Sequence, residues 1–206
     1  MAAQSSKRSS KKDTNGSVED RTAEICRTAA KVICEKGFDA ASMNDIAAAV
    51  NLTKAGLYYY TTGKLDLLYR IVEFAMTLVE EQVVQPCAAI EDPQERLQQM
   101  IRNHVILVAE GGGQISILSD EVNCLPPRER RAIIERKRQY LDFVRETMRE
   151  LKAAGHLQNL NPDIAALNLF ATISGVARWY RQGGKLSPEG VADEVVKFLL
   201  GGILQE

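Results

Sequence analysis

The sequence is poor in the residues that build metal sites, disulfides and membrane spans. Its 206 residues include 2 histidines and 4 cysteines, and none of Cys26, Cys34, Cys87 and Cys124 forms a Cys-x-x-Cys pair. No apolar run reaches the ~18 residues that cross a bilayer, and the N-terminal segment is polar and basic. These absences argue against a metal site, a disulfide scaffold and a membrane partner. They predict a cytoplasmic protein.

The residue sets of common enzymes are also missing. The sequence shows no Ser-His-Asp or Cys-His set, no carboxylate pair with a clear role and no phosphate loop. Gly111-Gly112-Gly113 lacks the Lys-Ser/Thr that would follow in such a loop, and it is interpreted as a helix stop. We therefore expect no catalytic residue, no cofactor and no bound metal.

Charge is nearly balanced overall, with a formal net charge of -1, but it is unevenly distributed. Residues 1–64 carry 10 Lys/Arg and 7 Asp/Glu, whereas residues 65–206 carry 16 and 20. This asymmetry predicts that any anion-binding function lies in the N-terminal third. Residues 1–19 are rich in Ser, Lys and Arg without periodicity, which predicts a disordered basic arm. Two interpretations stay open for that arm, a solubilising tail or an arm attracted to DNA phosphates or a minor groove.

From residue 20 onward every periodic segment is typical of a helix, and no alternating strand pattern is visible. Apolar residues recur at three- and four-residue spacing, while Gly, Pro and Asn mark the breaks. We predict an all-α protein of about nine helices, three short ones followed by six mostly longer ones. The longer helices are expected near residues 64–84, 93–110, 127–154, 162–182 and 188–203.

The three short helices, of about 15, 9 and 7 residues, have the organisation of a helix-turn-helix. Ser42 is expected to cap the second helix, with Asp45 three residues later in the manner of a capping box. Asn51 suits the left-handed conformation of the turn, and Thr53 is expected to cap the third helix. Lysine and small residues on a helix of this kind suit contact with the edges of bases in a major groove. Tyrosine hydroxyls and a lysine beside a helix N-terminus suit phosphates.

The stretch from Thr22 to Leu68 resembles the N-terminal domain of the TetR family of repressors. The residues that carry the resemblance are Ala29, Gly37, Phe38, Ser42-Met43-Asn44-Asp45-Ile46-Ala47, Val50, Asn51-Leu52-Thr53-Lys54-Ala55-Gly56-Leu57-Tyr58-Tyr59-Tyr60 and Lys64-Leu65-Asp66-Leu67-Leu68. The sequence departs from the family pattern at Thr61, where an aromatic or aliphatic residue is usual, and at Gly63, where Ser or Asn is common. Ser42 and Thr53 are caps as well as candidate contacts, and Tyr58 is a candidate for a half-buried ring.

The resemblance implies a DNA-binding domain at residues 20–66 and a ligand-binding and dimerisation domain at residues 67–206. It implies that contacts to double-stranded operator DNA come from Ser42, Asn44, Thr53, Lys54, Ala55, Gly56, Tyr58, Tyr59 and Lys64. It also implies a homodimer formed through the last two helices. The sequence supports that pairing, because the final helix has more apolar surface than one packed face requires.

The segment from Arg178 to Glu189, which contains the single tryptophan, is similar to one in TetR-type regulators that respond to acyl-coenzyme A thioesters. The expected effector is therefore a small hydrophobic molecule, an acyl-coenzyme A or a fatty acid. The candidate ligand-binding residues are His104, Phe170, Arg178, Trp179 and Arg181. Two alternatives stay open: Trp179 packs a helix end while the arginines are solvated, and His104 is a packed helical histidine.

Taken together, these features predict a ligand-responsive transcriptional repressor that binds a palindromic operator as a homodimer. One alternative is an effector-independent activator or architectural DNA binder, which would have a small and well-filled C-terminal core. Another is a helical enzyme or carrier that retains the DNA-binding head.

Overall fold

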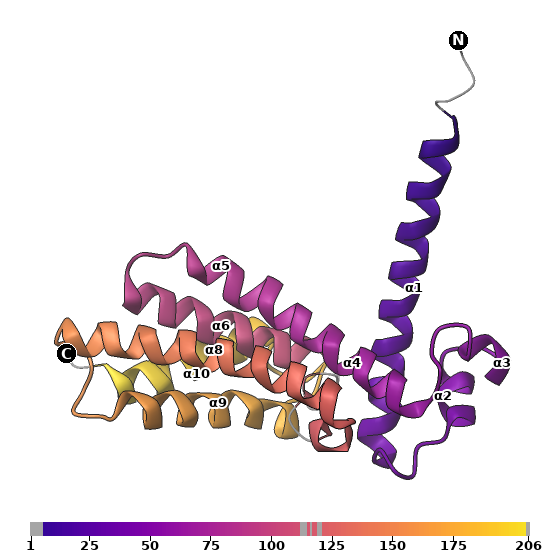
Figure 1. Ribbon diagram of the computed structural model, residues 1–206. Coiled ribbons are helices and arrows are strands. Elements are labelled where there is room, and N and C mark those ends of the chain that lie inside the picture. Colours follow the sequence, from indigo (N-terminus) through magenta and orange to yellow (C-terminus); the bar gives the residue numbers. More distant parts are fainter. Residues whose placement is uncertain (1–5, 112–114, 116, 119–120, 205–206) are drawn as a thin grey trace.

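The computed structural model describes residues 6–111, 115, 117–118 and 121–204, with side chains described from residue 21 onward. The predicted all-α class is confirmed: the described residues form helices, with one isolated bridge between Leu157 and Leu204. Figure 1 shows a small head of three helices joined by α4 to a larger helical bundle. Within the described residues, no helix is long and apolar enough to cross a membrane.

The head contains α1 (Ser6–Lys36), α2 (Met43–Ala49) and α3 (Lys54–Leu57). The predicted breaks are confirmed. Gly37 ends α1 with a φ of 80°, and Asn51 adopts a φ of 55° in the turn between α2 and α3. Both angles lie in the left-handed region, which Gly enters freely and Asn tolerates better than most residues. The third helix has four residues and is shorter than the expected seven.

The first helix differs from the sequence-based expectation at its start. The structure has helix from Ser6, whereas a disordered arm was expected over residues 1–19, of which residues 1–5 lie outside the described range. Helix propagation adds one hydrogen bond for each residue once a nucleus exists. The buried segment around Ile25 and Ala29 supplies that nucleus, and the polar residues before it have no proline to stop the helix.

The expected long helix after the head is confirmed, but it is not uniform. It consists of α4 (Lys64–Val79), a π-helical turn, η1 (Glu80–Val84), and α5 (Gln85–Ala88). Pro86 lacks an N–H, and in a regular α-helix its ring would clash with the carbonyl of Gln82. The wider π-turn directly before Pro86 accommodates the proline without ending the helix.

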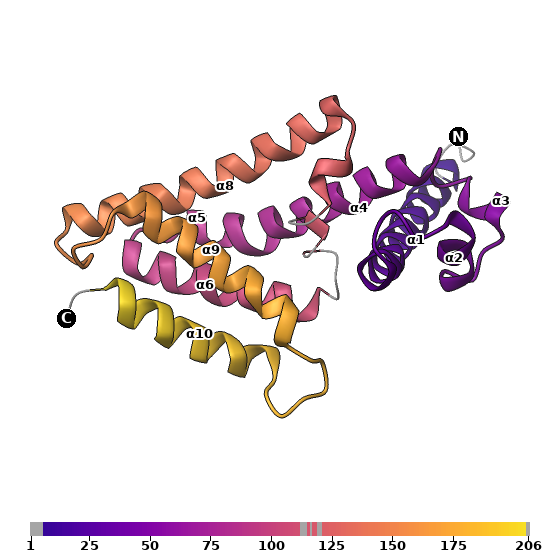
Figure 2. The same cartoon turned by 90° about the horizontal axis from the view of Figure 1, so that it is seen from below.

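The C-terminal bundle contains α6 (Pro93–Glu110), the short 3₁₀ segment η2 (Val122–Cys124), α8 (Pro127–Ala153), α9 (Pro162–Trp179) and α10 (Pro188–Ile203). In Figure 2, α6 and α9 lie between α8 and α10. Helix α6 contacts all three of these helices and is the central element of the bundle.

The starts of three bundle helices follow one pattern, a capping side chain and then proline. Asp92, Asn161 and Ser187 each accept hydrogen bonds from backbone amides in the first turn of α6, α9 and α10. Proline then occupies the first helical position, where its missing N–H is not needed. Helix α9 ends at Trp179, three residues before the expected stop at Gln182, because the backbone turns extended at the following residue.

Helix α4 has a buried apolar face that runs from one end of the helix to the other and joins the two parts of the molecule. Leu67, Leu68 and Ile71 belong to the same continuous core as the apolar residues of α1 and α2. Further along, Met76 and Val79 are buried where α4 contacts α8. Because one helix contributes to both cores, the position of the head depends on how α4 packs in the bundle.

Candidate functional site

The second helix of the head begins with the predicted capping box. The Asp45 amide donates to Ser42 Oγ at 3.1 Å, and the Ser42 amide donates to Asp45 Oδ2 at 2.9 Å. Lys36 Nζ lies 2.6 Å from the other carboxylate oxygen, so the end of α1 is tied to the start of α2. The Lys36 ammonium, followed by the hydroxyl and amide of Ser42, holds the pKa of Asp45 well below its usual range.

The third helix begins at the predicted cap as well. Thr53 Oγ1 accepts a hydrogen bond from the Gly56 amide at 3.0 Å. A Cβ on Gly56 would lie 3.3 Å from that same hydroxyl oxygen, which is tighter than ordinary van der Waals contact. Gly56 therefore keeps the first turn of α3 narrow and its outer surface smooth, which suits close approach to a groove.

Most of the residues expected to contact DNA are exposed on α2, on α3 and in the segments beside them. Tyr59 is 80% exposed and Tyr58 is 45% exposed, so the ring of Tyr58 is half buried, as considered from the sequence. Leu57, between these residues and the core, is fully buried and anchors α3. The other exposed residues of this set are Ser42, Asn44, Thr53, Lys54 and Ala55.

Lys64, at the start of α4, is turned toward the head. Its Nζ donates to the Asp39 carbonyl oxygen at 3.1 Å and lies 4.5 Å from the centre of the Phe38 ring. The cation and the ring attract each other electrostatically. Lys64 therefore connects α4 to the segment between α1 and α2.

The junction between α3 and α4 is closed by Thr61, one of the two positions that depart from the family pattern. Its buried hydroxyl contacts the Gly63 carbonyl and Asp66 Oδ2, each at 2.9 Å, and the Thr62 amide donates to the same carboxylate oxygen. Burial alone would raise the pKa of Asp66, but the Thr62 amide, the Thr61 hydroxyl and the Arg70 guanidinium outweigh it and lower the pKa. A polar residue at position 61 thus ties the segment before α4 to Asp66 in the first turn of that helix.

A cavity of about 670 Å³ lies in the bundle between α4, α6, α8 and α9. Its volume falls within the range of small-molecule sites. Most of the lining is apolar. The apolar lining residues are Met76, Val79, Ile115, Leu118, Ile134, Leu141, Leu167, Phe170 and Ala171.

Two of the predicted ligand-binding residues, His104 and Phe170, line this cavity. The structure adds Tyr140, whose hydroxyl lies 3.1 Å from His104 Nδ1. The Phe170 ring packs edge-on against both, with centroid distances of 4.9 Å to Tyr140 and 5.9 Å to His104. Burial lowers the pKa of His104 to about 4, so its ring is neutral at pH 7. His104 is thus both a packed helical histidine and part of the cavity wall.

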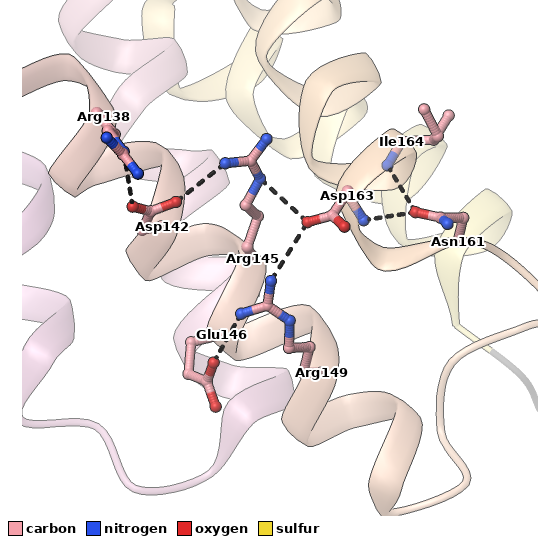
Figure 3. Close-up of polar contacts among 8 residues, drawn as sticks. All are labelled: Arg138, Asp142, Arg145, Glu146, Arg149, Asn161, Asp163 and Ile164. Atoms are coloured by element: carbon pink, nitrogen blue, oxygen red, sulfur yellow. Dashed lines mark hydrogen bonds and ion pairs between the residues drawn. The ribbon is translucent and has the colours of Figure 1, made fainter. Parts of the chain in front are cut away.

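Positive charge reaches the cavity from one helix, α8, through Lys137, Arg138 and Arg145. Figure 3 shows that Arg138 and Arg145 both approach Asp142, at 3.7 and 2.9 Å. Arg145 also lies 3.1 Å from Asp163 at the start of α9. These partly exposed ion pairs are individually weak, because solvent screens them.

The network continues along α8 beyond the cavity. Arg149 bridges Glu146 at 3.0 Å and Asp163 at 3.4 Å, and Asn161 caps α9 beside them (Figure 3). Asp163 therefore receives two arginines from α8 while it lies in the first turn of α9, where a negative charge is favoured. The start of α9 is fixed to α8 by charge, next to the cavity.

The remaining predicted ligand-binding residues lie elsewhere. Arg178, Trp179 and Arg181 are exposed at the C-terminal end of α9, Trp179 by 57%, and they are not among the cavity-lining residues. The sequence analysis did not single out Tyr140 or the cations of α8. The signal that could have found them is the arginine-rich pattern of residues 128–149, in which one tyrosine lies on the apolar face. Among the described residues, no cluster of metal-ligating side chains is present.

The fold and the exposed head define a helix-turn-helix protein with a helical C-terminal domain. The model of bacterial regulatory proteins of the tetR family matches residues 25–71, and the model of the tetracyclin repressor-like C-terminal domain matches residues 91–203. The chain belongs to the TetR family. It is a DNA-binding transcriptional repressor of that family and not an enzyme.

Similar proteins have related roles. The chain is 24% identical over 197 residues to the HTH-type transcriptional repressor KstR2 of Mycobacterium tuberculosis, covering 93% of this chain and 96% of KstR2. The structure of AibR in complex with isovaleryl coenzyme A and operator DNA is 34% identical, with a TM-score of 0.78 and coverage of 87% and 98%. The structure of the ketosteroid regulator KstR2 has a TM-score of 0.83 at 23% identity, covering 90% of this chain and 96% of KstR2, and shows likeness of fold.

The capping box generates a prediction about acid sensitivity. The pKa of Asp45 is lower in the folded protein than in an unfolded chain, so its stabilising contribution is present above about pH 4 and is lost as the pH falls below that value. We expect Asp45→Asn to lower the midpoint of thermal unfolding at pH 7. At pH 3 the difference in midpoint between the variant and the wild type should be smaller. Glu24→Gln, an exposed acid on α1, is the control. An equal difference at both pH values would contradict the prediction.

Proposed function

We propose that this repressor binds a palindromic operator as a homodimer and is released when a small hydrophobic or acyl-coenzyme A effector enters the bundle cavity. The observation that carries this proposal is that α4 belongs to both the cavity wall and the core of the head. Met76 and Val79 line the cavity, and Leu67 and Leu68 pack in the core that the head shares. A ligand that displaces the wall therefore shifts the helix that carries the DNA-binding surface.

The lining favours an effector with an apolar body and an anionic end. Apolar side chains form most of the wall, and Lys137, Arg138 and Arg145 supply positive charge on one side. The phosphates of coenzyme A would meet this charge by displacing the arginines from Asp142 and Asp163. AibR, which has been crystallised with isovaleryl coenzyme A and operator DNA, supports an acyl-coenzyme A for this chain as well.

Arg136 supports a mechanical connection between the cavity and α4. From α8 it contacts both carboxylate oxygens of Glu80 at 2.7 Å, and it donates to Thr77 Oγ1 at 3.0 Å. Paired contacts of this kind fix both the distance and the orientation of two elements. A shift of α8 on ligand entry would thus reach α4. For release, the ligand must bind more tightly to the form that does not hold DNA.

The cavity also bears on the alternative of an effector-independent DNA binder. That alternative expects a small and well-filled C-terminal core. An apolar cavity of about 670 Å³ leaves many side chains without packing partners on one side, which is costly unless a ligand fills it. The effector-responsive function is therefore favoured.

The homodimer is proposed to form through α9 and α10. On α10, Phe198 is 73% exposed, and Gly201 and Gly202 lie on the same helical face with open space where a Cβ would be. On α9, Ile164 is exposed, and Gly175 likewise has open space. Apolar and small residues that face solvent allow a second copy to approach closely. Two heads on one dimer would read half-sites about 34 Å apart, or a multiple of that spacing.

For the DNA-binding surface, we expect Lys54→Ala and Tyr59→Ala each to weaken binding to the DNA flanking the encoding gene by about tenfold or more. The lysine loses a contact to a base edge or phosphate, and the tyrosine loses a contact to the backbone. Fluorescence anisotropy with labelled DNA measures the change. Lys197→Ala, an exposed lysine on α10, is the control; unchanged affinity of both head variants would contradict the assignment of α3 as the reading helix.

For the effector, we expect isovaleryl coenzyme A at a hundredfold excess over its Kd to raise the midpoint of thermal unfolding by about 5 °C. The same ligand should release the labelled DNA. Free coenzyme A and isovalerate should each have a weaker effect, because each fills only part of the site. No shift and no release with any of the three would overturn the acyl-coenzyme A assignment.

For the dimer, we expect Phe198→Glu to produce a monomer in sedimentation velocity and to abolish tight operator binding, because one head alone holds a single half-site. The charge would be buried against the partner without a counter-charge, which is strongly unfavourable. Lys152→Glu, at an exposed position on α8, introduces the same carboxylate on a helix outside the proposed interface. A Phe198→Glu protein that remains dimeric would exclude this face as the interface.

A further inference from the structure

Besides Ser174 of α9 and the three cations of α8, two buried polar side chains line the cavity. His104 comes from α6 and Tyr140 from α8, each is 6% exposed, and both line the cavity. Their mutual contact, Tyr140 Oη to His104 Nδ1 at 3.1 Å, is the hydrogen bond that these side chains make within the part of the chain that the structure describes. Phe170 packs edge-on against both rings and restricts their motion.

The number of protons on this pair is fixed by its surroundings. Burial keeps the His104 ring neutral, with a pKa of about 4, and burial raises the pKa of Tyr140 above its ordinary value. The pair therefore holds two polar hydrogens, one on the imidazole and one on the phenol. One of them lies in the mutual hydrogen bond. The other remains as a donor in either tautomer: His104 Nε2–H when the tyrosine donates, or Tyr140 O–H when the imidazole Nδ1–H donates.

We propose that the His104–Tyr140 pair recognises a carbonyl oxygen of the effector, and that it selects acyl thioesters over apolar molecules of the same shape. This inference rests on the proposed acyl-coenzyme A function and names the group that is read inside the cavity. A carbonyl oxygen accepts a hydrogen bond and has no hydrogen to donate, so it complements a pair that always presents one donor. Leaving that donor unpaired in a desolvated complex is unfavourable, which is the source of the selectivity.

The cations of α8 fit the same arrangement. Arg138 and Arg145 also line the cavity, so a single ligand can present its phosphates to them and its thioester to His104 and Tyr140. The apolar residues then surround the acyl chain. The phosphate contacts bind any coenzyme A ester, whereas the His104–Tyr140 pair donates a hydrogen bond only to a ligand that has the carbonyl.

The test compares isovaleryl coenzyme A with its thioether analogue, in which a methylene replaces the carbonyl, by isothermal titration calorimetry on the full chain. We expect the wild type to bind the thioester at least about tenfold more tightly than the thioether. The double variant His104→Phe/Tyr140→Phe retains ring packing but has no donor, so it should bind both ligands with equal affinity. Each single variant keeps one donor and should retain part of the preference. Tyr69→Phe removes a phenol hydroxyl outside the cavity and should leave the preference for the thioester unchanged.

The outcomes separate this inference from the proposed function. If the wild type binds neither ligand, the acyl-coenzyme A function is overturned and the inference with it. If the wild type binds both ligands equally, the effector function stands and carbonyl recognition is overturned. A double variant that still prefers the thioester would also overturn it, because the donor would lie elsewhere. Should the double variant fail to fold, the wild-type preference and the two single variants still decide the question.

Discussion

The burial of one face of α4 in both the head and the bundle is the constraint on which the structure depends. Its apolar residues belong to a core that runs without interruption from Ile25 in the head to Ile203 in α10. A helix without a buried face could slide or tilt at little cost, but a helix whose apolar face is packed in both the head and the bundle has few alternative positions. Movement of the head is therefore tied to discrete rearrangements of the bundle and does not occur as free motion about a linker.

The polar groups of the bundle are arranged around that core in two different ways. Along α8, arginines are matched with carboxylates at the surface, and the neutral network of Figure 3 can exchange partners at modest cost. Inside the cavity, His104 and Tyr140 share one hydrogen bond in a desolvated setting, where exchanging that partner is costly. The surface network suits adjustment to a charged ligand, and the internal pair suits discrimination. Both belong to the same cavity wall.

Local features of the fold could be predicted from the sequence because their causes are local. Ser42, Thr53, Gly37 and Asn51 act through hydrogen bonds or backbone angles within a few residues, and the structure confirms each of them. The cavity is different, since it depends on which faces of distant helices meet. Trp179 shows the limit: its neighbours in the sequence are suited to a ligand, yet it lies at a helix end on the outer surface.

Only part of the candidate site could be predicted from the sequence, for the same reason. His104 and Phe170 could be selected because each lies on an apolar helix, whereas Tyr140 is isolated in a strongly charged helix and becomes significant only through its contact with His104. The role of Lys64 shows a related effect. Its sequence position suggests a phosphate contact, but the Phe38 ring and the Asp39 carbonyl, which come from another segment, also compete for its charge.

The π-helical turn at Glu80–Val84 has a consequence for how the length of this chain can change during evolution. A π-turn holds about one residue more than an α-turn, and each residue of an α-helix advances by about 100°. Deleting one residue here would turn the π-turn into an ordinary α-turn and leave the residues after it in nearly their present orientation. A one-residue deletion in the regular part of α4 would instead rotate everything after it by about 100°, and the buried Cys87 would leave the core. The helix can therefore lose one residue within the π-turn and still keep the rotational phase between the cavity wall and α5, whereas a deletion within α4 would change that phase.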